Sequence, residues 1–151
     1  MLQLRGATDA DAPAVADVLI AARRVIPEVR WAHDDEDLRG WVQSTLIPRG
    51  GVTVAVDQGR IVGVLAVARQ ADTAWIEQLS VDPRQLRSGI GGTLLRHALA
   101  TLPRPLRLWT FQPNTNARVF YEHHGFVAVR FTDGVENEER FPDVLYERAQ
   151  P

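Results

Sequence analysis

The fold of this chain is decided by the stretch VDPRQLRSGIGGTLL, residues 81–95, which lies between a strand pattern and a helix pattern. Residues 75–81 alternate as a strand does, and Pro83 cannot continue a ladder of hydrogen bonds, so we expect the strand to end there. The alternation predicts one shared face for Trp75, Glu77, Leu79 and Val81. After the stretch, apolar residues recur at the spacing of an amphipathic helix that runs to Pro103.

Three glycines stand where this helix begins, at positions 89, 91 and 92. Each costs helix stability, about 1 kcal/mol relative to alanine, so the pattern indicates that something must approach the backbone closely. A helix start offers free N–H groups and a positive dipole end, which suit phosphate oxygens. Two common phosphate-binding patterns do not fit. Residue 94 is Leu where G-x-G-x-x-G needs glycine, and the chain contains no Lys for a phosphate loop.

The hexapeptide LRSGIG, residues 86–91, resembles motif A of the GCN5-related N-acetyltransferases (GNAT), Q/R-x-x-G-x-G/A. This family transfers acetyl groups from acetyl-CoA to amines. Both glycines match, whereas Leu86 replaces the Gln or Arg of the motif. Gln85 and Arg87 flank that position with polar side chains.

A second stretch, NTNARVFYEHHGF at residues 114–126, resembles the other signature of the family, N-x-x-A-x-x-F-Y-x-x-x-G-F. The matching positions are Asn114, Ala117, Phe120, Tyr121, Gly125 and Phe126. The two motifs follow the order and separation of the family, and the resemblance covers about residues 50 to 130. The chain is therefore identified as a member of the GNAT superfamily.

The composition is typical of a soluble globular protein, with 45% hydrophobic and 24% charged residues. Its 151 residues suit one domain, 1–151. No apolar run approaches the ~20 residues of a membrane span, and the first 25 residues lack a secretory signal, so we expect a cytoplasmic protein with no membrane partner. A net charge of −2 argues against nucleic-acid binding. The absence of cysteine excludes thiolate chemistry, and we expect no metal site, because the sequence has no recognisable pattern of metal ligands.

The order of elements expected from these patterns is β-α-α-β-β-β-α-β-α-β-β, a three-layer α/β domain with a mixed central sheet flanked by helices. Residues 8–11 resemble a capping box before the first helix, and residues 57–60 form the turn of a hairpin. All basic residues are Arg, which together with abundant Ala indicates a GC-rich, bacterial genome. The resemblance places the first two helices beside the acceptor groove. Trp31 and Trp41 either line that groove or are core aromatics.

The resemblance implies acetyl-CoA as co-substrate, with its pantetheine arm on backbone groups of residues 77–81, where the central strands splay apart. A backbone N–H at Leu79 would face the thioester oxygen, and the phenol of Tyr121 would lie beside the sulfur as a general acid. The expected CoA-binding residues are Leu79, Ser80, Val81, Arg87, Ser88, Gly89, Ile90, Gly91, Gly92, Thr93, Asn114, Ala117 and Phe120. Asn114 either hydrogen-bonds the pantetheine or caps its own helix.

Glu77 is the candidate base, because it lies on the strand that would carry the thioester. The alternatives are a structural acid paired with an Arg, and solvent acting as the base. His97, His123 and His124 are weaker candidates. The expected function is an N-acetyltransferase acting on a small-molecule or peptide amine, as a monomer or homodimer. A non-catalytic CoA-binding module and a transferase of longer acyl groups remain alternatives.

Two acidic segments add a hypothesis about the acceptor. One opens the second expected helix at residues 34–37, and the other fills the loop before the last strand. The acids of that loop are Asp133, Glu136, Glu138, Glu139 and Asp143. If both segments face one cleft, they would attract a cationic amine. The alternative is a helix start matched to its dipole and a solvated loop.

Overall fold

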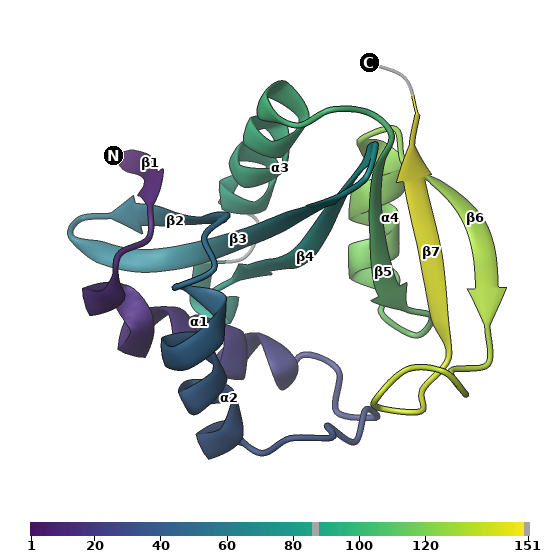
Figure 1. The fold of residues 1–151 in the computed structure, drawn as a ribbon, viewed down its shortest axis with the longest axis horizontal. Helices are drawn as coiled ribbons and strands as arrows, with labels where there is room; N and C mark the ends of the chain where they lie inside the picture. Colours follow the sequence, from purple (N-terminus) through teal and green to yellow (C-terminus); the bar gives the residue numbers. More distant parts are fainter. Residues whose placement is uncertain (86–87, 150–151) are drawn as a thin grey trace.

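A seven-stranded mixed sheet forms the middle layer of the molecule, in the order β1-β2-β3-β4-β5-β7-β6 (Figure 1). The computed structural model describes residues 1–85 and 88–149. The strands are β1 (Leu2–Gly6), β2 (Val52–Asp57), β3 (Arg60–Gln70), β4 (Thr73–Val81), β5 (Leu106–Phe111), β6 (Val127–Thr132) and β7 (Asp143–Arg148). The main helices are α1 (Ala12–Arg23), α2 (Asp35–Trp41), α3 (Ile90–Thr101) and α4 (Thr115–His123). The predicted order of elements and the α/β class are confirmed.

Two apolar clusters, one on each face of the sheet, hold these layers together. On one face, α1 and α2 pack their apolar stripes against β2 and β3, as Val15 of α1 and Val64 of β3 illustrate. On the other face, α3 and α4 cover β3, β4, β5 and β7, with Leu94 of α3 and Tyr146 of β7 fully buried. Burial of these side chains is the main source of the stability of the fold.

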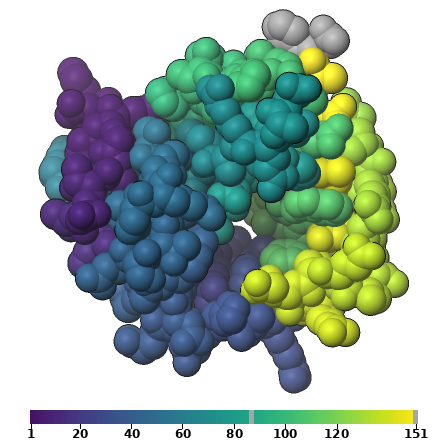
Figure 2. Space-filling model, viewed as in Figure 1, coloured from purple at the N-terminus to yellow at the C-terminus, as the bar shows by residue number. Residues whose placement is uncertain are grey.

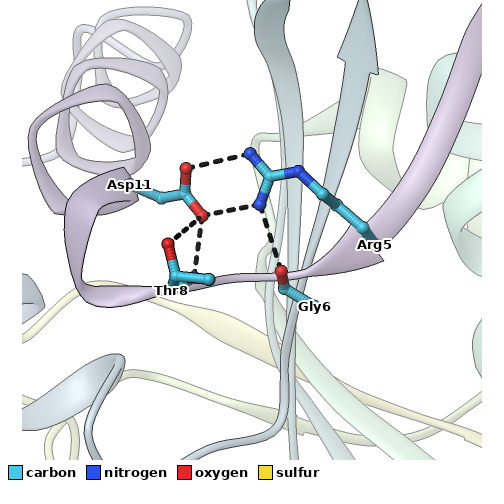
Figure 3. Close-up of polar contacts among 4 residues, drawn as sticks. All are labelled: Arg5, Gly6, Thr8 and Asp11. Carbon is cyan, nitrogen blue, oxygen red and sulfur yellow. Dashed lines mark hydrogen bonds and ion pairs between the residues drawn. The ribbon is translucent and has the colours of Figure 1, made fainter.

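Local sequence signals account for the first half of the sheet. The turn between β2 and β3 has positive φ at both Gln58 and Gly59, the geometry that suits a two-residue hairpin. The predicted capping box before α1 is also present: the Thr8 N–H donates to Asp11 at 2.7 Å. Arg5 of β1 donates to both carboxylate oxygens of Asp11, at 2.7 and 3.0 Å, which fastens the edge strand to this turn (Figure 3).

Strands β4 and β5 run parallel and then separate. Their pairing covers only Ala74–Ile76 against Leu106–Leu108, and in Figure 1 the two strands diverge beyond it. The expected splay is therefore confirmed. Within the described residues, the second half of β4 has a strand partner on its β3 side alone. Its other edge is left with free backbone groups.

A β-bulge at Glu77 overturns the predicted shared face. Ile76 is opposite Val67 and Gln78 is opposite Ala66, so Glu77 is an extra residue on β4. The bulge reverses the alternation: Ile76 before it and Leu79 after it pack against the same cluster under α3 and α4. Glu77 itself contacts Arg49, which follows α2 on the opposite face. The prediction that Glu77 shares a face with Leu79 and Val81 was wrong, because a period of two does not survive an inserted residue.

Candidate active site

A cleft of about 370 Å³ occupies the gap between the diverging strands β4 and β5. Its walls come from both halves of the chain: α1, β4 and β5 contribute, and so do Ala117 and Tyr121 of α4. Figure 2 shows the surface hollowed at the centre of the view, between the blue N-terminal helices and the yellow loop near the C-terminus. Of the predicted residues, Glu77, Leu79, Ser80, Asn114, Ala117 and Tyr121 line this cleft.

The open edge of β4 aims N–H groups into the cleft. Just beyond the strand, the Asp82 N–H donates to Val62 of β3 at 2.9 Å. Because backbone N–H groups alternate between the two edges of a strand, those of Leu79 and Val81 point away from β3. This edge can receive an extended chain with amide groups of its own, since such a chain can hydrogen-bond as a strand would.

The first turn of α3 is built for a close backbone approach. Gly89 is the N-cap residue with φ +85°, a conformation that disfavours side chains, and its carbonyl accepts from the Thr93 N–H at 3.0 Å. The N–H groups of Ile90, Gly91 and Gly92 precede any possible intrahelical acceptor. Ser88 hydrogen-bonds the carbonyl of Gln85. The predicted contact of Arg87, and Leu86 beside it, lie outside the described residues.

Tyr121 projects from α4 to the cleft and is 8% exposed. Its ring packs edge-on against Phe120 and Phe126, at centroid distances of 5.3 and 5.7 Å. Burial raises the pKa of the Tyr121 phenol above its ordinary value of 10.0. Among residues 1–85 and 88–149, no group hydrogen-bonds this hydroxyl. The phenol is therefore neutral at pH 7 and available to a partner that enters the cleft.

The remaining residues of the second motif have structural contacts of their own. Asn114 caps α4, accepting from the Ala117 N–H at 3.3 Å, while both residues also line the cleft. Phe120 packs toward the start of α3, where Gly91 leaves room for its ring. His124 contacts the Phe120 carbonyl through Nδ1 at 2.9 Å. Neither it nor His97 or His123 is among the residues that line the cleft.

Glu77 forms an ion pair with Arg49, and both side chains are partly exposed. The Arg49 guanidinium also lies 5.8 Å from the ring centroid of Trp41, within reach of a cation–π contact. In this structure Glu77 is therefore an acid paired with an Arg, which is one of the alternatives expected from the sequence. Because Glu77 stands on the bulge and lines the cleft, it is also positioned to contact a bound acceptor. Arg49 was missed, because no motif distinguishes it from the other arginines.

Two aromatic side chains of the cleft lining, Trp31 and Phe111, pack together, and Phe141 extends the cluster. Trp31 meets Phe111 edge-on at 5.7 Å, and Phe111 meets Phe141 at 5.6 Å. Arg23 lies 4.7 Å over the Trp31 ring. Trp31 lines the cleft, and Phe111 of β5 links it to Phe141 in the loop before β7.

Most acids of the two predicted segments have local partners. Asp34 caps α2 and Asp35 pairs with Arg24. Glu138 contacts His33 at 3.2 Å, and Glu139 accepts from the Ala32 N–H at 3.1 Å. The loop acids thus contact residues 32 and 33, directly before the first acidic segment, and Glu139 lines the cleft. These contacts join two loops, and the acids that make them do not form a free anionic surface.

No cluster of three or more His, Asp or Glu side chains in the described part of the chain suits a metal ion. No helix in that part has the length and apolar character needed to cross a bilayer.

The sequence model of the acetyltransferase (GNAT) family matches residues 16–126. The chain belongs to this family. No curated protein matches this GNAT chain in sequence. The likenesses below concern the fold, since all identities are under 25%.

Three solved structures illustrate the likeness of this GNAT chain to known proteins. The PaiA N-acetyltransferase of Thermoplasma acidophilum, in complex with coenzyme A, has TM-score 0.78 and 16% identity, covering 99% of both chains. The ribosomal-protein-S18-alanine N-acetyltransferase of Escherichia coli has TM-score 0.75 and 18% identity, covering 100% of this chain and 96% of its own. Naa50 of Arabidopsis thaliana, in complex with the bisubstrate analogue CoA-Ac-MVNAL, has TM-score 0.74 and 19% identity, covering 99% of both chains.

Proposed function

We propose that this protein is an acetyl-CoA-dependent N-acetyltransferase that acts by direct attack of an amine in a ternary complex. The observation that carries the proposal is the cleft between β4 and β5, which joins the open edge of β4 to the buried hydroxyl of Tyr121. The structures of PaiA with coenzyme A and of Naa50 with a CoA-peptide analogue support it as examples from the same fold.

In this proposal, the backbone of the β4–α3 loop and the first turn of α3 hold the pyrophosphate of CoA. The residues involved are Arg87, Ser88, Gly89, Ile90, Gly91, Gly92 and Thr93. Free N–H groups at a helix start favour anions through both hydrogen bonding and the helix dipole. The pantetheine arm then follows Leu79, Ser80 and Val81, with Asn114 and Ala117 on the opposite wall. Phe120 contributes by fixing the start of α3 relative to α4.

The reaction needs two protons to leave the amine and one to reach the sulfur. The ammonium form of the acceptor first loses one proton to Glu77, directly or through water. The neutral nitrogen then attacks the thioester carbonyl, whose oxygen takes the negative charge and accepts from the Leu79 N–H. Collapse forms the amide, breaks the C–S bond and releases the second proton from nitrogen. The CoA thiolate takes a proton, so the net products are amide, CoA thiol and one proton.

In this proposal, Tyr121 interacts with the leaving thiolate of CoA. Its raised pKa makes it a weaker acid than a free phenol, and the ordinary pKa of a thiol is about 8.5. Complete proton transfer from this phenol is thus less favourable than hydrogen-bond donation. We therefore assign Tyr121 the role of a donor that stabilises the thiolate as the C–S bond breaks.

The test combines calorimetry with a CoA-release assay. We expect acetyl-CoA to bind and at least one amine of a panel to be acetylated, the panel comprising amino acids, polyamines, aminoglycosides and N-terminal peptides. Tight CoA binding with no turnover on any amine would instead assign a non-catalytic CoA-binding module. Faster turnover with a longer acyl-CoA would revise the acyl group. Sedimentation would distinguish a monomer from a homodimer.

A further inference from the structure

A second cavity, of about 460 Å³, lies on the α2 face of the sheet and contains three of the four tryptophans of the chain. We call it the tryptophan pocket, lined by Trp41, Arg49, Ala68, Gln70, Trp75, Ile76, Glu77, Gln78 and Trp109. It shares Ile76, Glu77, Gln78 and Trp109 with the cleft between β4 and β5. The two cavities therefore meet at the β4 bulge, beside the proposed position of the thioester.

The charges of the tryptophan pocket are balanced. Among its lining residues, all of which the structure describes, Arg49 and Glu77 are the charged side chains, and they pair with each other. Their side chains are 41% and 36% exposed. A charged ligand group can therefore replace Glu77 at Arg49, or Arg49 at Glu77. Water still reaches both side chains during this exchange, so neither becomes an unpaired buried charge.

We propose that the tryptophan pocket holds the acceptor, and that the acceptor is a free α-amino acid with a large apolar or aromatic side chain. The α-ammonium group would replace Arg49 at the Glu77 carboxylate, and the α-carboxylate would replace Glu77 at Arg49. The side chain would lie among the indoles. This inference rests on the proposed acetyltransferase function and specifies its acceptor.

A zwitterion suits this pocket better than a simple amine. An amine without a carboxylate would displace Arg49 from Glu77 and leave the guanidinium without an anionic partner. A zwitterion brings one charge of each sign, on atoms close enough to engage both partners of the existing pair. The planar guanidinium matches a carboxylate with two parallel hydrogen bonds. Indole faces favour an apolar or aromatic side chain over a small or polar one.

The same placement puts the amine where it can react. Glu77 is the extra residue of the bulge. Both Glu77 and the adjacent Gln78 line the two cavities. An amine held by Glu77 is therefore at the junction of the two cavities, next to the free edge of β4. Loss of its proton to Glu77 or water leaves the nitrogen lone pair free to attack the thioester carbon, as in the proposed reaction.

The experiment compares kcat/KM for L-phenylalanine, L-phenylalaninamide, phenethylamine and L-alanine in wild type and variants. We expect wild type to prefer phenylalanine to each of the other three by at least about tenfold. Arg49→Gln should remove the preference for phenylalanine over its amide. Trp75→Leu should reduce the preference for phenylalanine over alanine. Arg39→Gln is the matched control, since Arg39 pairs with Asp17 outside the pocket, and it should leave every ratio unchanged.

Equal kcat/KM for phenylalanine and its amide in wild type would overturn the inference even if acetyl transfer is confirmed. So would an Arg49→Gln variant that keeps the preference. If no amine is acetylated, calorimetric titration of L-phenylalanine onto the CoA-bound protein tests the pocket separately from the proposed function, and no binding there overturns the inference. Arg49→Lys, checked by circular dichroism, replaces Arg49→Gln if the latter does not fold. Lysine keeps the charge but lacks the planar fork, so a smaller preference for phenylalanine over its amide is expected there.

Discussion

A Cβ atom at Gly91 would lie 3.5 Å from Cζ of Phe120, so the first turn of α3 packs directly on α4. The two sequence motifs that identify the family are therefore in contact, although Gly91 and Phe120 are 29 positions apart in the chain. This contact fixes the direction in which the free N–H groups of α3 point. The distance is that of ordinary van der Waals contact, so a single methyl group fits, whereas a larger or charged group must move Phe120 or Val81.

The first prediction compares Gly91→Asp with Gly91→Ala. The alanine variant should fold and bind CoA nearly as wild type does. The aspartate variant should lose about five- to thirtyfold in CoA affinity, because a negative charge at a helix start that binds anions opposes them by ~1–2 kcal/mol. Calorimetry gives the affinity and thermal unfolding checks the fold. Unchanged affinity in a folded Gly91→Asp variant would move the phosphate site away from this turn.

The second prediction concerns the hydroxyl of Tyr121. Tyr121→Phe keeps the packed ring and should lower kcat by about 10²-fold or more, with little change in KM for acetyl-CoA or in melting temperature. Tyr146→Phe is the control: its hydroxyl is bound by Arg118 at 3.0 Å and binds Glu122 at 2.6 Å. That variant should lose stability, by about 1 kcal/mol, with a much smaller loss of kcat. An unchanged kcat for Tyr121→Phe would leave Tyr121 as a packing residue.

The third prediction follows from the direction of the Tyr121 pKa. A donor must be protonated, and burial raises this pKa above 10.0, so deprotonation should not limit the rate below that pH. We expect no fall in kcat below pH 10 that is due to deprotonation of Tyr121. The pH–rate profile of wild type and of Tyr121→Phe provides the measurement. An alkaline fall near pH 8 that disappears in the variant would contradict the raised pKa.

The sequence predicted those parts of the fold that depend on local chemistry. The hairpin at Gln58 and Gly59 and the glycine start of α3 each follow from backbone preferences of a few residues. Such signals do not reveal the bulge at Glu77, because its extra residue depends on the register of β3 against β4. One inserted residue then reversed the expected face of the candidate base.

The tryptophan pocket was likewise beyond sequence reasoning. Trp41, Trp75 and Trp109 come from α2, β4 and β5, and only the tertiary fold brings them together. The same holds for Arg49, whose significance depends on its contact with Glu77. The CoA site, in contrast, was predictable in outline, because continuous motifs encode the α3 start and the first half of α4.

The fourth prediction concerns acid stability and the contact in Figure 3. Hydrogen bonds from Arg5 lower the pKa of Asp11 from 3.8 to about 2. A lowered pKa stabilises the fold above pH 3.8, and this contribution is lost as the pH falls from 3.8 toward 2. Asp11→Asn should therefore lower the free energy of unfolding by about 1–3 kcal/mol at pH 7 and by much less at pH 2.

Urea denaturation at the two pH values measures this difference. Asp9→Asn is the control, because Asp9 is an exposed acid in the same turn. It should change the stability by less than about 0.5 kcal/mol at either pH. An Asp11→Asn variant as stable as wild type at pH 7 would mean that the contact with Arg5 adds nothing to the fold.

The last prediction tests electrostatic steering by the acidic segments. Asp34 and Asp35 are occupied by a helix cap and by Arg24, and Glu138 and Glu139 by His33 and the Ala32 backbone. Arg24 offsets the charge of Asp35, and salt screens the remaining acids, with a Debye length of about 10 Å at 0.1 M. We therefore expect kcat/KM for a cationic amine and for a zwitterionic one to fall by similar factors between 20 and 200 mM salt. A selective loss for the cationic amine would show that these acids do steer it, and the matched variant Glu139→Gln should then abolish part of that loss, since Glu139 lines the cleft itself.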